Sequence, residues 1–198
     1  MLPLVLAQLS LMGMNVMDAT MSGHAGPVDL AGVSMGASLF MPVTASFTGI
    51  LAASTPMIAQ LLGRRRKQDI PHVVRTGMAL GMLLTALFAL IYFLAIDLVM
   101  SFLSLDSGVA RIATVYLMLM IGNLFFQTIM FPLRALIDTS GSTATSMKLM
   151  LSALPINGLL NYMFIFGRLG APRLGGIGAG VATVCTAAIL FGMFLWVI

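Results

Sequence analysis

The sequence predicts an all-α, polytopic membrane protein, and three features of the 198-residue chain support this fold class. Hydrophobic residues make up 60% of the chain and charged residues only 8%, whereas about 25% of the residues in a typical soluble domain are charged. The mean hydropathy is +1.06. The apolar residues also gather in long runs, so we expect the chain to be surrounded by a lipid bilayer.

Six apolar segments are long enough to cross a membrane, because a helix needs about 20 residues to span roughly 30 Å of hydrocarbon. We predict transmembrane helices over residues 2–22, 30–62, 73–103, 109–137, 145–166 and 175–198. The first segment begins without the charged region of a cleavable signal peptide, so we interpret it as a span. The last segment ends without a polar tail, which suggests a piece of a longer protein.

The segment 30–62 is longer than one straight crossing requires, and it contains Pro42 and Pro56. Each proline removes a backbone hydrogen bond, so we expect one kinked and tilted helix. Pro132 and Pro155 lie inside the fourth and fifth segments. Interrupted helices are tolerated in membranes where neighbours or a cavity satisfy the freed backbone groups, which favours a transporter-like bundle.

The loop 64–75 sets the predicted orientation, because it holds half of the basic residues of the chain. These residues are Arg64, Arg65, Arg66, Lys67 and Arg75. The positive-inside rule places this loop in the cytoplasm, and we expect a multi-pass protein of the plasma (inner) membrane. The basic residues form no stripe with interleaved aromatic residues, so nucleic acid is not an expected partner.

Asp18 is the most informative single residue of the sequence. It lies near the outer end of the first span, and a carboxylate inside hydrocarbon costs several kcal/mol on most scales. Gln8, Asn15, Asp18 and Ser22 fall within an arc of about 80° on a helix, so we expect this polar stripe to face the bundle interior. The alternatives are an interfacial Asp18 that caps the following loop and polar residues that only join helices.

Two further helices carry aligned polar residues. Asn157 and Asn161 are four residues apart on the fifth span and share a face, so with a carboxylate from another helix they form a candidate cation or proton site. The alternative is an amide clamp between helices. On the fourth span we expect Tyr116, Asn123 and Gln127 to line a substrate pathway, together with Gln8 and Asn15 of the first span.

Arg134 and Asp138 continue the line of polar residues on the fourth span, near its cytoplasmic end. Their spacing of four residues suits an ion pair across one helical turn, so we interpret them as an interfacial ion pair.

The sequence does not indicate an enzyme. Residues 32–36 match G-x-S-x-G around Ser34, but the only histidines, His24 and His72, lie on opposite sides of the predicted membrane. Close helix packing explains the glycines better. We find no metal-binding or phosphate-binding motif, so we expect no metal and no cofactor besides a coupling ion.

Methionine and phenylalanine are abundant, with 18 and 12 residues respectively. Both suit a cavity that binds lipophilic cations of many shapes. The alternative, which we favour for most of them, is contact with lipid and with other helices.

Several stretches, taken in order, resemble the multidrug and toxic compound extrusion family. They are residues 17–24, residues 30–33, residues 49–51, residues 56–63, the pieces Pro155-Ile156-Asn157 and Asn161-Tyr162, and residues 170–183. Members of this family are secondary drug antiporters with twelve helices in two six-helix lobes. The resemblance implies that this chain is the N-terminal lobe and that the C-terminal lobe is absent from it.

The resemblance also implies functional roles. H⁺ or Na⁺ would drive the export of drugs and organic cations, and Asp18 would take part in cation coupling with Asn157, Asn161 and Thr183. Pro3 matches a proline that bends the first helix. Some members carry an acid where this chain has Asn161, so the coupling ion stays open. The expected partners are the lipid bilayer, the drug substrate and the missing lobe.

Three alternatives to drug antiport stay open. One is a half-transporter without activity of its own, and another is a flippase-type transporter of a lipid or glycan precursor. The third is an intramembrane enzyme that uses Ser34.

Overall fold

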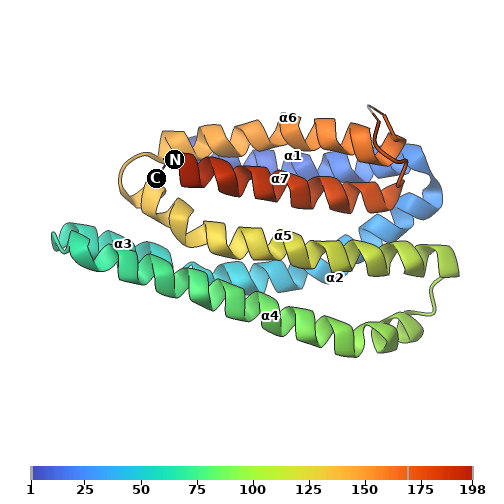
Figure 1. Ribbon diagram of the computed structural model, residues 1–198, viewed down its shortest axis with the longest axis horizontal. Coiled ribbons are helices and arrows are strands. Elements are labelled where there is room, and N and C mark those ends of the chain that lie inside the picture. The colour runs from blue at the N-terminus through green and yellow to red at the C-terminus, as the bar shows by residue number, and fades with distance from the viewer. Residues whose placement is uncertain (1, 169, 198) are drawn as a thin grey trace.

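The protein is all-α, as predicted. A computed structural model describes residues 2–168 and 170–197, with side chains from residue 5 onward, and this part of the chain contains no β-strand (Figure 1). The elements are α1 (Leu2–Ala25), α2 (Pro27–Leu51), α3 (Ser54–Gly63), a short 3-10 helix η1 (Lys67–Asp69), α4 (Ile70–Leu103), α5 (Ser107–Thr139), α6 (Thr143–Phe166) and α7 (Gly176–Val197).

Five helical stretches of the described residues are long and apolar enough to cross a membrane. They are Pro27–Gly63, Lys67–Leu103, Ser107–Thr139, Thr143–Phe166 and Gly176–Val197. The outward side of α4 is apolar, with Leu94 77% exposed and Leu98 72% exposed, as expected for a surface that faces lipid. α1 is 24 residues long and packs along α6 (Figure 1). The chain is therefore a multi-pass membrane protein.

The predicted second segment is divided into two helices. α2 ends at Leu51 and α3 begins at Ser54, whereas we expected a single kinked helix. Pro56 has no N–H to donate to the Ala52 carbonyl, and the Thr55 amide donates to that oxygen instead, at 3.1 Å. Pro42, by contrast, lies inside the continuous helix α2. The missing hydrogen bond at Pro56 therefore breaks the helix one turn before the proline.

The helices pack around α5, which contacts α2, α4 and α7, while α6 lies between α1 and α7. Glycine allows two of these close approaches. Gly36 of α2 lies against the Tyr116 ring of α5, and Gly178 of α7 lies against the α6 backbone at Phe164. Gly36 belongs to the G-x-S-x-G stretch, and Ser34 between its glycines is exposed on a helix. These glycines therefore serve helix packing, as the sequence suggested.

One polar contact joins two helix ends, and a second lies within a single helix. Asp29, in the first turn of α2, accepts a hydrogen bond from the Gly176 amide at the start of α7 at 2.6 Å. It thereby satisfies one of the free amides of that helix end. At the opposite end of the bundle, Arg134 Nε lies 3.5 Å from Asp138 Oδ2, which confirms the predicted ion pair.

The close contact at Gly178 leads to a stability prediction. A Cβ at position 178 would lie 2.6 Å from the Phe164 backbone, so we expect Gly178→Ala to destabilise the protein by about 1–3 kcal/mol. Gly192 lies on the same helix, and a Cβ at that position would meet no neighbouring helix or side chain within 4 Å, so Gly192→Ala is the matched control. Melting temperatures in detergent measure both effects. Equal melting temperatures for the two variants would contradict the proposed contact.

Candidate functional site

Asp18 lies at the centre of a buried polar network in the outer half of the bundle. It is only 5% exposed. Its Oδ1 accepts a hydrogen bond from Asn161 Nδ2 at 2.6 Å, and its Oδ2 accepts one from Thr183 Oγ1 at 2.9 Å. The two oxygens therefore connect α1 to two different helices, α6 and α7. The three residues come from distant parts of the sequence.

Asn157 extends the network along α6. Its Oδ1 accepts a second hydrogen bond from Asn161 Nδ2 at 3.0 Å, and both amide side chains are fully buried. The spacing of four residues places the two amides on one face of α6, as the sequence predicted. The structure thus brings together all four residues that we expected to couple ions.

Three polar atoms near this carboxylate have no hydrogen-bond partner within the described residues. They are Ser22 Oγ, Asn157 Nδ2 and Asn161 Oδ1. Ser22 lies one helical turn beyond Asp18 on α1. A buried polar atom without a partner costs about 1–3 kcal/mol, so unpaired atoms mark places where a ligand or proton changes the bonding.

Within the described residues, no cationic side chain forms an ion pair with Asp18. The ion pairs of the described residues are Arg66 with Asp69 and Arg134 with Asp138, and neither includes Asp18. The hydrogen bonds that Asp18 accepts from other side chains come from a neutral amide and a neutral hydroxyl. A buried carboxylate in such surroundings requires a proton or a cation to balance its charge.

The predicted polar stripe of α1 is only partly buried. Asp18 and Ser22 face the interior, but Gln8 and Asn15 are exposed on the surface of the lobe. The expectation that the whole stripe faces the bundle interior is therefore wrong for these two residues. The arc of polar residues on α1 is wider than the contact between α1 and α6, so part of it lies outside that contact. Pro3 lies in α1, but its side chain is outside the described residues.

The polar residues of α5 lie inside the packing of the lobe. Tyr116 is buried between Gly36 of α2 and Gly180 of α7. Asn123 is also buried, and its Oδ1 accepts a hydrogen bond from Gln127 Nε2 at 3.3 Å. Their role in a substrate pathway stays a prediction.

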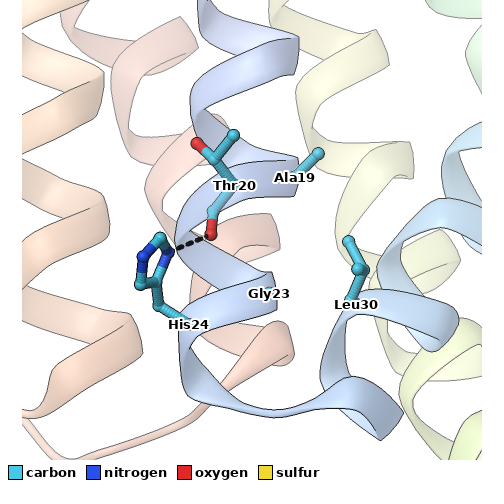
Figure 2. A pocket seen from close by; sticks show the side chains of 5 residues that line it. All are labelled: Ala19, Thr20, Gly23, His24 and Leu30. Carbon is cyan, nitrogen blue, oxygen red and sulfur yellow. Dashed lines mark hydrogen bonds between the residues drawn. The ribbon is translucent and has the colours of Figure 1, made fainter.

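A shallow hollow lies at the outer end of α1, beside the start of α2. Figure 2 shows Thr20 and His24 on α1, with Leu30 on α2 across from them. The His24 Nδ1 lies 2.7 Å from the Thr20 carbonyl oxygen. Helical periodicity places both residues on the face of α1 opposite to Asp18, so this hollow does not open onto the carboxylate. His24 belongs to α1, whereas we expected it in a loop.

Comparison with known proteins supports a transporter. The MatE family profile matches residues 3–163. The chain is 43% identical over 187 residues to the probable multidrug resistance protein NorM of Bacillus cereus, an alignment that covers 93% of this chain and 40% of that protein. The NorM of Oceanobacillus iheyensis is 39% identical over 197 residues, covering 100% of this chain and 44% of that protein. The chain therefore spans less than half the length of these relatives.

Solved structures show the same fold. A MOP superfamily transporter from Pyrococcus furiosus superposes with a TM-score of 0.87 at 20% identity, covering 98% of this chain and 42% of that chain. The eukaryotic MATE transporter AtDTX14 superposes with a TM-score of 0.86 at 19% identity, covering 98% and 43%. The six predicted spans thus correspond to one lobe of a larger transporter fold.

The uncompensated charge of Asp18 leads to a second stability prediction. Asp18→Asn removes the charge and keeps the size and one acceptor, so we expect a melting temperature in detergent at or above that of the parent. Asp18→Ala leaves a cavity and removes the acceptor from Asn161 and Thr183, so we expect a loss of about 1–3 kcal/mol. A large loss in Asp18→Asn would instead mean that the charge itself stabilises the fold.

Proposed function

Because the chain belongs to the MatE family, we propose that it is the ion-coupling lobe of a secondary active transporter that exports drugs or organic cations in exchange for H⁺ or Na⁺. The observation that carries the proposal is the buried Asp18 carboxylate, which has only neutral hydrogen-bond partners. Such a group is stable when an ion neutralises it and less stable without one. Binding and release of that ion supply the two states that coupled transport needs.

The amides beside Asp18 suit both charge states. In the ionised state the Asn161 amide group donates to Asp18 and to Asn157, as the observed distances of 2.6 and 3.0 Å describe. When Asp18 carries a proton, its O–H needs an acceptor. Rotation of the Asn161 side chain by half a turn presents Oδ1, and the same rotation of Asn157 presents an N–H to that oxygen. The chain of hydrogen bonds then runs in the opposite direction without moving the backbone.

Sodium would use the same oxygen-rich surroundings. The Asp18 carboxylate, Asn161 Oδ1 and Ser22 Oγ are oxygen atoms, and the last two lack partners within the described residues. Oxygen donors are the ligands that hard cations prefer. The site therefore suits either ion, and transport assays with separate H⁺ and Na⁺ gradients decide between them.

Neutralising Asp18 changes what holds α1 in place. Hydrogen bonds from Asn161 and Thr183 to a carboxylate are stronger than those to a neutral acid. Thr183 Oγ1 also lies 2.9 Å from the Ala179 carbonyl, so its hydroxyl has another acceptor when the bond to Asp18 weakens. Protonation would thus weaken the bonds that join α1 to α6 and α7, which connects proton movement to alternating access.

The proposed substrates follow from the relatives and from the side chains of this lobe. The relatives are named as multidrug resistance proteins. On α1, Gln8, Met12 and Asn15 are exposed on one side, which offers apolar and amide groups but no basic charge. Such a surface accepts lipophilic cations and does not repel them. The second lobe would supply the opposite wall of the cavity.

Ethidium efflux tests the role of Asp18. We expect Asp18→Asn in the complete gene product to abolish coupled efflux from pump-deficient cells, because the amide cannot take up and release the coupling ion. The variant should still reach the membrane at the level of the parent, as a tagged protein on immunoblots measures.

Asp97 provides the matched control for this assay. It is also an aspartate in a long apolar helix, but it is exposed on α4. Asp97→Asn should retain efflux. Normal efflux in Asp18→Asn, or an equal loss in both variants, would overturn the assignment of the ion site.

A further inference from the structure

The hairpin between α3 and α4 extends beyond the rest of the lobe. Figure 1 shows this hairpin reaching well past the level at which α1 begins and α7 ends. The helices that flank it are α3, which ends at Gly63, and α4, which begins at Ile70. The hairpin therefore lies at the membrane surface on the side that the positive-inside rule assigns to the cytoplasm.

The hairpin carries a concentrated positive charge. Residues 64–75 contain five basic residues and one acidic residue, a formal charge of +4 that equals the net charge of the whole chain. The basic side chains are all exposed. Within the described residues, Arg66 pairs with Asp69 at 2.9 Å, and the ion pairs include no acidic partner for Arg64, Arg65 or Lys67.

A hollow of about 300 Å³ lies between α3 and α4 beneath this charge. One side of its lining is apolar and includes Met57, which is 52% exposed, together with Leu61 and Val73. Gln60, Arg64 and His72 also line the hollow and supply hydrogen-bond donors. The Asp69 carboxylate lines it as well, and its charge is balanced by the ion pair with Arg66. The hollow thus combines an apolar wall with cationic and polar groups within one small space.

Leu61 and Val73 of the lining pack against a buried apolar cluster. Ile58 of α3 and Ile70 and Val74 of α4 are buried and pack against Leu133 of α5 in one apolar cluster. Exposed residues around the hollow can therefore be changed without removing the contacts that hold the hairpin on the lobe.

We propose that this hollow binds an anionic phospholipid of the cytoplasmic leaflet. The headgroup phosphate would lie against Arg64, with Arg65 and Lys67 within reach of the remaining charge. The acyl chains would extend from Met57 along the exposed apolar side of α4. Charge and shape together favour a lipid: a free anion would not need the apolar wall, and a zwitterionic lipid would gain little from the excess positive charge. The inference is independent of ion coupling at Asp18.

The test measures binding of acyl-labelled fluorescent phosphatidylglycerol to the complete transporter in detergent, with labelled phosphatidylcholine as the comparison lipid. The triple variant Arg64→Gln/Arg65→Gln/Lys67→Gln removes three charges from the hairpin. We expect its affinity for phosphatidylglycerol to fall at least about tenfold. The control Arg111→Gln/Arg168→Gln/Arg173→Gln removes three exposed charges from the opposite end of the lobe and should leave the affinity unchanged.

Two further measurements distinguish a lipid site from the binding of a free anion or of charge alone. Met57→Gln keeps the charge and should weaken lipid binding about threefold, because the acyl chain loses apolar contact. Inorganic phosphate at millimolar concentration should not displace the lipid. Equal losses in the hairpin and control variants, equal binding of phosphatidylcholine, an unaffected Met57→Gln variant, or displacement by phosphate would each overturn the proposal.

Discussion

The burial of one carboxylate constrains how the helices of the lobe pack. Asp18 can stay between α1, α6 and α7 only because two neutral donors on two different helices reach its oxygens. That arrangement requires α6 and α7 to lie close together. Gly178 makes this approach possible, since its missing side chain lets α7 lie against the α6 backbone. The polar site and the glycine contact therefore both depend on the close packing of α6 against α7.

The helices and the central site residues were predictable because both depend on local chemistry. Apolar runs of sufficient length indicate spans, and a single carboxylate in such a run must find polar partners. The i, i+4 spacing of Asn157 and Asn161 indicated which face of α6 would supply them. Thr183 followed only from a family resemblance, because nothing local shows that its hydroxyl meets α1. Proline chemistry predicted a disturbance in residues 30–62, but not whether the helix would bend or break.

Other features depend on distances between helices, which periodicity does not contain. Gln8 and Asn15 lie within the same arc as Asp18, yet they are exposed, because the contact between α1 and α6 is narrower than the polar stripe. Asp29 is a similar case: its partner is a backbone amide on α7, and backbone amides leave no signature in a sequence. In both cases the sequence does not show which neighbouring helix a given helix face contacts.

These placements give α1 two different sides. Its buried side carries Asp18, the proposed ion site, and its exposed side carries Gln8 and Asn15. A rigid helix cannot shift one side without the other, so any movement that follows neutralisation of Asp18 also moves the exposed polar groups. In the proposed antiport, ion and substrate would need no shared ligand, because competition between them would act through the position of α1. The basic hairpin lies at the opposite end of the lobe, where the proposed lipid contact would hold α3 and α4 while α1 moves.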